Sequence, residues 1–167
     1  MRWLKRTSWA VGLLLSLLVI GAAGGVGSVL VQLARRLTSL TIIGTASRPE
    51  TREWVQSLGA HHVIDHSQPM APQLAAIGLP QVDLVLSLTH TEQHLPEILE
   101  VIAPQGQFGL IDDLPVLDVM PFKRKAISVH WELMFTRPLF ATPDMVAQHH
   151  LLNEVAQLVD AGLLRTT

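Results

Sequence analysis

Cysteine and tyrosine are both missing from this 167-residue sequence. Without cysteine, the chain can form no disulfide bond and has no thiolate to act as a nucleophile or to hold a structural zinc ion. Without tyrosine, it has no Tyr-x-x-x-Lys acid/base pair, which argues against the short-chain dehydrogenases. A strong excess of one charge is missing too, since the formal net charge is −2. Nucleic acid binding requires a basic face, so we expect no nucleic acid partner.

Formal charge is absent from residues 8–34, which follow a basic segment at residues 1–6. A basic start, an apolar run and small residues are typical of a signal peptide, and the run is also long enough to cross a bilayer. Five glycines and Gln32 interrupt it, however. A buried parallel strand, a glycine-rich loop and a helix would give a similar run. We therefore expect a soluble, cytoplasmic protein with no membrane contact; a protein anchored or secreted through residues 1–34 is the alternative.

Short apolar runs alternate with segments of helical periodicity along the remaining chain. Two of the expected helices have predicted caps, from Ser47 to Glu50 and from Thr142 to Asp144. This alternation predicts an α/β fold, a doubly wound parallel sheet of the Rossmann-like type with strand order 3-2-1-4-5-6. We expect strands at residues 14–20, 41–46, 62–65, 82–87, 107–111 and 126–133, and helices at residues 26–37, 47–58, 69–77, 92–102 and 142–159.

Glycines gather in one loop between the first expected strand and the first expected helix. Gly21 permits a tight exit from the strand, and Gly27 permits close packing of the helix. A helix N-terminus at this place favours the anionic pyrophosphate of a dinucleotide. The loop is one residue longer than the minimal G-x-G-x-x-G pattern, and an unliganded turn is the alternative, but its place in a strand-helix-strand unit favours the dinucleotide. The predicted binding residues here are Gly21, Ala23, Gly24, Gly25, Val26 and Gly27.

The residues after the second expected strand indicate which dinucleotide is bound. NAD sites place an Asp or Glu there, whereas an arginine accommodates the 2′-phosphate of NADP. This sequence has Ser47 and Arg48 at that point and no carboxylate between Gly27 and Glu50. A guanidinium group suits a phosphate monoester, so we expect NADP(H) as the cofactor. The alternative is that Ser47 only caps a helix and that Arg48 is only a solvated residue of its first turn.

Ligands of such folds lie outside the carboxyl ends of the strands. This rule predicts further cofactor contacts after the third, fourth and fifth strands, at His66, Ser87, Leu88, Thr89, Ile111 and Asp112. The histidines predict no metal site, because their spacing gives no third ligand near His90 and His94. No nucleophile elbow of the form G-x-S-x-G is present, and the sequence assigns no catalytic residue.

Several segments, in the same order, resemble the zinc-type alcohol dehydrogenase and quinone oxidoreductase branch of the medium-chain dehydrogenases. The similarity runs from about Leu17 to Thr167. It is carried by the glycine loop with residues 17–20 before it, by Gln32-Leu33-Ala34-Arg35, and by residues 46–51, 58–65 and 153–162.

The resemblance implies an NADPH-dependent oxidoreductase that passes hydride to a quinone, an enone or another small carbonyl compound. In that family, Ser47 and Arg48 match the 2′-phosphate site, and the segment from Met134 to Thr136, which contains Phe135, matches a loop near the nicotinamide. The edge strand from Ile127 to Glu132 matches a strand used for subunit pairing, which suggests a homodimer.

The chain departs from the family at both of its ends. The family carries a GroES-like barrel domain that supplies most of the substrate pocket and any catalytic zinc, and nothing here corresponds to it. We therefore expect residues 17–167 to form a dinucleotide-binding domain that is incomplete at the C-terminus, and residues 1–16 stay unassigned. A carbonyl substrate is expected only together with a substrate domain. The alternative function is a non-catalytic NADP(H)-binding module or a truncated remnant.

Overall fold

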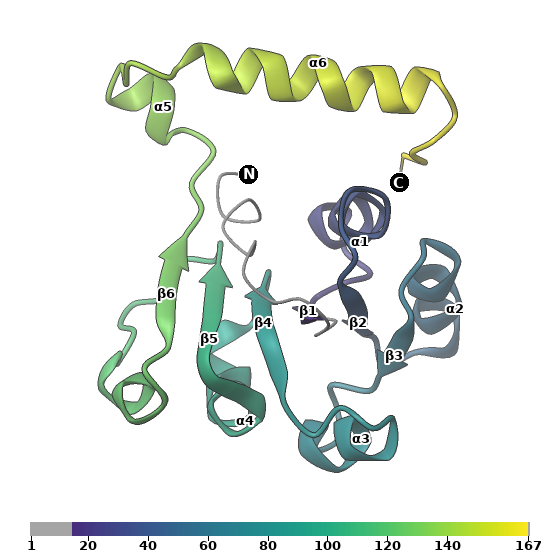
Figure 1. The fold of residues 1–167 in the computed structure, drawn as a ribbon, viewed down its shortest axis with the longest axis vertical. Helices are drawn as coiled ribbons and strands as arrows, with labels where there is room; N and C mark the ends of the chain where they lie inside the picture. Colours follow the sequence, from purple (N-terminus) through teal and green to yellow (C-terminus); the bar gives the residue numbers. More distant parts are fainter. Residues whose placement is uncertain (1–14, 167) are drawn as a thin grey trace.

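The computed structural model describes residues 15–166 as strands alternating with helices (Figure 1). Every neighbouring pair of strands in the six-stranded sheet is parallel, and the strand order is β3-β2-β1-β4-β5-β6. The Rossmann-like fold and the strand order predicted from the sequence are both confirmed. The elements in chain order are β1 (Ser16–Ile20), α1 (Gly25–Leu37), β2 (Thr41–Thr45), α2 (Pro49–Ser57), β3 (His62–Ile64), α3 (Met70–Ala76), β4 (Val82–Ser87), α4 (Thr91–Val101), β5 (Ile102–Leu110), the 3-10 helix η2 (Met120–Lys125), β6 (Ser128–Trp131), α5 (Thr136–Leu139) and α6 (Val146–Asp160).

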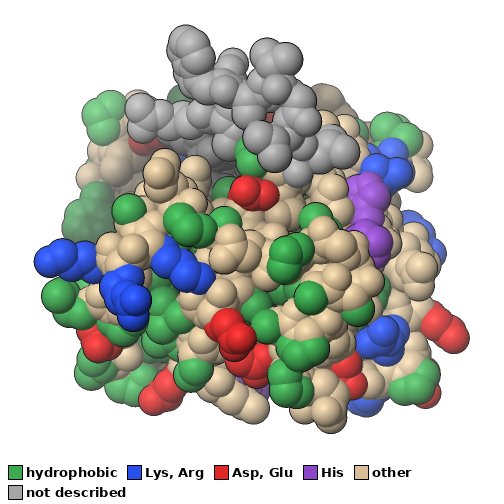
Figure 2. Space-filling view, turned by 60° about the horizontal axis from the view of Figure 1, so that its bottom comes forward, with side chains coloured by type: hydrophobic (Ala, Val, Ile, Leu, Met, Phe, Trp, Pro, Cys, Tyr) green, Lys and Arg blue, Asp and Glu red, His purple; other side chains and the backbone are tan. Residues whose placement is uncertain are grey.

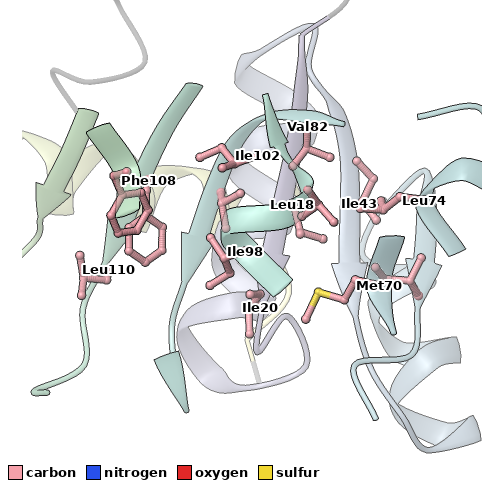
Figure 3. Close-up of a cluster of buried hydrophobic side chains, with 14 residues drawn as sticks. Leu18, Ile20, Ile43, Met70, Leu74, Val82, Ile98, Ile102, Phe108 and Leu110 are labelled. Atoms are coloured by element: carbon pink, nitrogen blue, oxygen red, sulfur yellow. The ribbon is translucent and has the colours of Figure 1, made fainter. Parts of the chain in front are cut away.

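Two apolar layers cover the two faces of the sheet. On one face, side chains of α3 and α4, such as Met70 and Ile98, pack against Leu18 and Ile43 of the central strands (Figure 3). On the other face, α1 and α2 pack on β1 and β2, and Val55 of α2 is fully buried there. Each such side chain contributes about 1.5–3 kcal/mol by leaving water. Burial of the central strands on both faces explains why they are continuous apolar runs.

The charge-free run that could have indicated a membrane segment is divided in the structure. Its described part contains β1, the glycine loop and most of α1, while residues 1–14 lie outside the described residues. Among residues 15–166, no helix is both long enough and apolar enough to cross a membrane. One face of the molecule carries side chains of both charge signs among apolar ones (Figure 2).

Both predicted helix caps are wrong. Pro49 is the first residue of α2, and proline holds the residue before it in an extended conformation, so Arg48 rather than Ser47 is the N-cap. The other predicted cap fails because Asp144 is bonded to Thr142 and Arg137. The helix α6 begins two residues later, with Met145 as its N-cap.

Three further elements differ from the sequence-based expectation. The strand β5 starts at Ile102 rather than at residue 107, and it contains the predicted turn as an irregularity in which Gln105 has a φ of 63°. Its register with β4 shifts at this point. The short helices η2 and α5 were not expected. Helix α6 has no buried residue and runs beyond the ends of β5 and β6 toward α1 (Figure 1).

Candidate functional site

The glycine loop is a tight turn between β1 and α1. Gly21 has a φ of 80°, a conformation that side chains rarely adopt, and its carbonyl oxygen accepts a hydrogen bond of 3.1 Å from the Gly24 N–H. The Gly21 N–H donates to Thr45 Oγ1 at the end of β2, at 3.2 Å. Thr45, which sequence reasoning did not single out, thus ties the loop to the neighbouring strand.

The first turn of α1 is open to solvent and has no capping side chain. Gly24 is the N-cap, no side chain among residues 15–166 caps the helix, and no acidic residue lies in its first turn. Gly24, Gly25 and Val26 are exposed, and a Cβ atom added to Gly25 would meet nothing within 4 Å. The first N–H groups of a helix have no partner within it, and the helix dipole places positive charge there. The structure therefore has an open site suited to an anion at the start of α1.

Two other glycines of the loop have close neighbours. A Cβ atom on Gly27 would lie 2.7 Å from the Ala22 Cα and would overlap the Gly21 carbonyl oxygen. A Cβ atom on Gly21 would lie 2.9 Å from Thr89 Cγ2 and 3.5 Å from Leu88 Cβ. The loop thus packs closely on itself and on the residues after β4. The structure thereby brings Gly21, Leu88 and Thr89 together, three of the residues predicted for the site.

Ser47 and Arg48 directly follow the segment that ends β2, and both are exposed. No hydrogen bond or ion pair engages the Arg48 guanidinium within residues 15–166. Arg52, one turn later in α2, donates to the carbonyl oxygens of Ala46, at 3.2 Å, and Val63, at 2.9 Å. Arg52 was missed by sequence reasoning and joins the ends of β2 and β3. A second guanidinium group therefore lies beside the segment that contains Arg48.

Polar residues at the ends of β4 and β5 are bonded to one another. Ser87 Oγ lies 2.7 Å from Thr91 Oγ1, and the Asp112 carboxylate accepts from both the Thr91 N–H, at 3.0 Å, and the Thr91 hydroxyl. Asp112, which follows β5, thus caps the start of α4. Ser87 and Asp112 lie at the predicted ends of their strands, with Ile111 bonded through its N–H to the Ser87 carbonyl oxygen. Thr91, which joins them, carries no motif that would have identified it.

Two other predicted contacts follow β3 and β6, the two edge strands of the sheet. The His66 ring meets the His94 ring of α4 edge-on, with centroids 5.7 Å apart, in the layer of α3 and α4. Burial, and next the neighbouring His66, lower the pKa of His94. Phe135 is the N-cap of α5 and is 55% exposed. It follows β6, which is three strands from β1 in the sheet.

The described residues do not fit a zinc ion. Within residues 15–166, no group of three or more histidines and carboxylates is arranged to hold a metal. The chain has no cysteine to serve instead.

The sheet and its two helix layers define a Rossmann-like α/β domain. A family model described as zinc-binding dehydrogenase matches residues 25–140, and the chain belongs to this family. The family assignment confirms the resemblance seen in the sequence.

Similar proteins come from several bacteria. A zinc-type alcohol dehydrogenase-like protein of Staphylococcus aureus is 36% identical over 156 residues, which are 91% of this chain and 45% of that protein. A crystal structure from Rhizobium etli, assigned as a zinc-dependent alcohol dehydrogenase, is 61% identical, with a TM-score of 0.89 over 95% of this chain and 46% of that one. The quinone oxidoreductase of Escherichia coli, solved with NADPH, shares the fold at 19% identity and a TM-score of 0.75, over 98% of this chain and 50% of that one. This chain thus spans about half the length of these relatives.

Proposed function

We propose that this chain binds NADP(H) and is the cofactor-binding part of an oxidoreductase. The observation that carries the proposal is the first turn of α1, which is open, free of acidic residues and lined by Gly24 and Gly25. A dinucleotide pyrophosphate fits there because it is anionic and needs close access to backbone N–H groups. Residues 17–167 would form the dinucleotide-binding domain.

The preference for NADP(H) over NAD(H) rests on Arg48. It is exposed at the end of the β2 segment, and its guanidinium group has no partner within residues 15–166, so it is available to a 2′-phosphate. The first carboxylate after the loop is Glu50, in the first turn of α2. Thr45 and Arg52 would act indirectly, by holding the loop and the ends of β2 and β3 in place.

When bound, NADPH would supply a hydride. The proposed reaction transfers this hydride to a quinone, an enone or another small carbonyl compound. The names of two similar proteins support this class of reaction, since one is a quinone oxidoreductase solved with NADPH and the other is a zinc-type alcohol dehydrogenase-like protein. A GroES-like domain would supply the substrate pocket. Leu88 and Thr89, which touch the loop, would border the nicotinamide side of the cofactor.

Replacement of Arg48 by alanine tests the cofactor assignment. We expect Arg48→Ala to weaken NADPH binding by about 1–3 kcal/mol, because a charge-assisted hydrogen bond is lost, and to leave NADH binding nearly unchanged. Titration of NADPH fluorescence measures both affinities. Arg124→Ala is the matched control, since Arg124 is an exposed arginine of η2. Equal losses for NADPH and NADH would contradict the assignment.

A second candidate is an NADP(H)-binding module without turnover. It is favoured because the described residues offer an open anion site at the start of α1, while none of them has been assigned a catalytic role. Hydride transfer depends on holding cofactor and substrate together, so a cofactor domain alone gains little rate from binding. A panel of quinones added to the NADPH-bound protein separates the two candidates. Tight binding without NADPH oxidation would exclude the enzyme for this chain and leave the binding module.

A cytoplasmic location is also part of the proposal. It is supported by β1 and α1, which occupy much of the charge-free run that a membrane anchor would need. Fractionation of cells that express the full chain tests it. A membrane-bound or cleaved product would overturn it.

A further inference from the structure

A pocket of about 650 Å³ lies at the other end of α1 from the glycine loop. Arg35 and Arg36 are in the last turn of α1, ten residues beyond its first residue, which is about 15 Å along the helix. The end of α2 and the segment after α6 complete the pocket. Its lining residues are Gln32, Arg35, Arg36, Ser57, Leu58, Gly59, Gly162, Leu163 and Arg165. The pocket is therefore separate from the proposed cofactor site.

Contacts on several sides hold Arg165 in place. Its backbone N–H donates to Gln32 Oε1 at 2.8 Å, and its carbonyl oxygen accepts from Gln32 Nε2 at 3.0 Å. Its guanidinium group donates to Ser57 Oγ at 2.7 Å and lies 5.0 Å from the centre of the Trp54 ring. A guanidinium fixed in this way loses little further conformational entropy when it binds a ligand.

Arg35, which lines the pocket, contacts a histidine outside the lining. His61 Nδ1 accepts from the Ile42 N–H at 2.9 Å, so the proton of the neutral ring lies on Nε2. That Nε2 atom is 2.9 Å from Arg35 Nη1, which can only donate. Burial, and next the charge of Arg35, lower the pKa of His61. The Arg35 guanidinium thus lies against a ring nitrogen and not against a carboxylate, so this contact does not neutralise its charge.

Among residues 15–166, no carboxylate pairs with the arginines of the pocket. None of its lining residues is a carboxylate, and within residues 15–166 the structure contains one ion pair, between Arg137 and Asp144. The C-terminal ends of α1 and α2 add about half a negative charge each. These two partial charges do not cancel three guanidinium groups. The pocket therefore favours an anion of more than one negative charge.

We propose that this pocket binds a phosphate monoester or free phosphate, as a second anion site independent of the cofactor. Phosphate suits it because guanidinium groups bind phosphate oxygens in paired hydrogen bonds, and because the volume is within the range of small-molecule sites, about 300–1,000 Å³. Arg36 and Arg165 would be the principal ligands, and Arg35 would complete the donor set.

Isothermal titration of the full chain, saturated with NADPH and in low salt, tests the proposal with two probes, inorganic phosphate and AMP. We expect binding of one or both that Arg36→Gln weakens about tenfold and that Arg36→Gln/Arg165→Gln abolishes. Tighter binding of AMP would identify a monoester ligand, and equal affinities would identify free phosphate. Arg124→Gln, which alters an exposed arginine of η2, is the matched control and should bind as the unaltered chain does.

Two results would overturn the second site. One is the absence of heat from either probe at millimolar concentration. The other is an equal affinity in Arg36→Gln and in the unaltered chain, which would place the anion elsewhere. Circular dichroism of each variant verifies that it is folded. The outcome is distinct from that of the cofactor test, because the NADPH titration of Arg48→Ala involves no residue of this pocket.

Discussion

Substitution of Gly27 by alanine would place a methyl group against backbone atoms. The new Cβ would lie 2.7 Å from both the Cα and the carbonyl carbon of Ala22, and it would overlap the Gly21 carbonyl oxygen. Ordinary carbon contacts lie at about 3.5–4.0 Å. The start of α1 must therefore move away from β1 by close to 1 Å, since backbone cannot rotate aside as a flexible side chain can.

The cost of this movement can be bounded. Overpacking of a well-packed interior costs about 1–3 kcal/mol, and contact with backbone places Gly27→Ala near the upper end. Alanine has a better helix propensity than glycine, which offsets up to about 1 kcal/mol of this cost. We therefore expect Gly27→Ala to lower the free energy of unfolding by about 2 kcal/mol. Gly25→Ala is the matched control, because its Cβ would meet nothing within 4 Å. It should be as stable as the unaltered chain, or up to about 1 kcal/mol more stable.

Urea unfolding followed by far-ultraviolet circular dichroism measures both stabilities, and NADPH fluorescence measures both affinities. If a pyrophosphate occupies the open first turn of α1, the Gly25→Ala methyl group meets it. NADPH binding should then fall tenfold or more without any loss of stability. A Gly27→Ala variant as stable as Gly25→Ala would refute the packing argument. An unchanged NADPH affinity in Gly25→Ala would refute the position of the phosphate.

Three further predictions concern the ends of the strands, the histidines and the sheet edge. Asp112→Ala should lower the free energy of unfolding by about 1–3 kcal/mol, because the Thr91 N–H and hydroxyl lose their acceptor; the exposed neighbour in Asp113→Ala should have little effect in the same urea assay. Because burial lowers the pKa of His61 and His94 from 6.5, the unfolded chain binds protons that the folded chain does not. The stability that comes from these neutral histidines should be fully present above pH 6.5 and should be lost as the pH is lowered through the folded pKa values. A melting temperature that rises on acidification would contradict this expectation. Finally, the Glu132 N–H donates to the Leu110 carbonyl oxygen, and N–H groups alternate in direction along a strand, so the Trp131 N–H faces away from β5. We expect a dimer that pairs through this free edge of β6, and we expect Trp131→Pro, which removes that N–H, to dissociate it. An unaltered chain that sediments as a monomer at all concentrations would exclude the dimer.

Continuous apolar runs made the sheet predictable. The strand β4 has the expected bounds, because a short run without polar alternation is typical of a strand buried on both faces. The short helices η2 and α5 have six and four residues, too few to show helical periodicity. The turn residues of β5 concealed its first half, since Pro104 and Gly106 are typical of a strand end, whereas here pairing resumes after a shift of register.

The candidate site was predictable only where a residue type is required by backbone geometry. Gly21 and Gly27 follow from a tight turn and a close helix-strand contact, and the structure has both features. Thr45, Arg52 and Thr91 could not have been found in this way. Their roles come from contacts between elements distant in the sequence, and many polar residues in those positions would give the same pattern.

The two anion sites proposed for this domain depend on opposite relations between charge and helix geometry. At the start of α1, backbone N–H groups and the helix dipole attract the anion, so no charged side chain is needed and glycine gives access. At the end of α1, the dipole opposes an anion, and binding must come from Arg35, Arg36 and Arg165. Salt screens exposed side-chain charges over about 10 Å at 0.1 M. Added salt should therefore weaken phosphate at the arginine pocket more than it weakens NADH at the glycine loop, because NADH has the pyrophosphate but lacks the 2′-phosphate that Arg48 would bind. Equal salt dependence of the two would show that side chains, and not the helix start, hold the pyrophosphate.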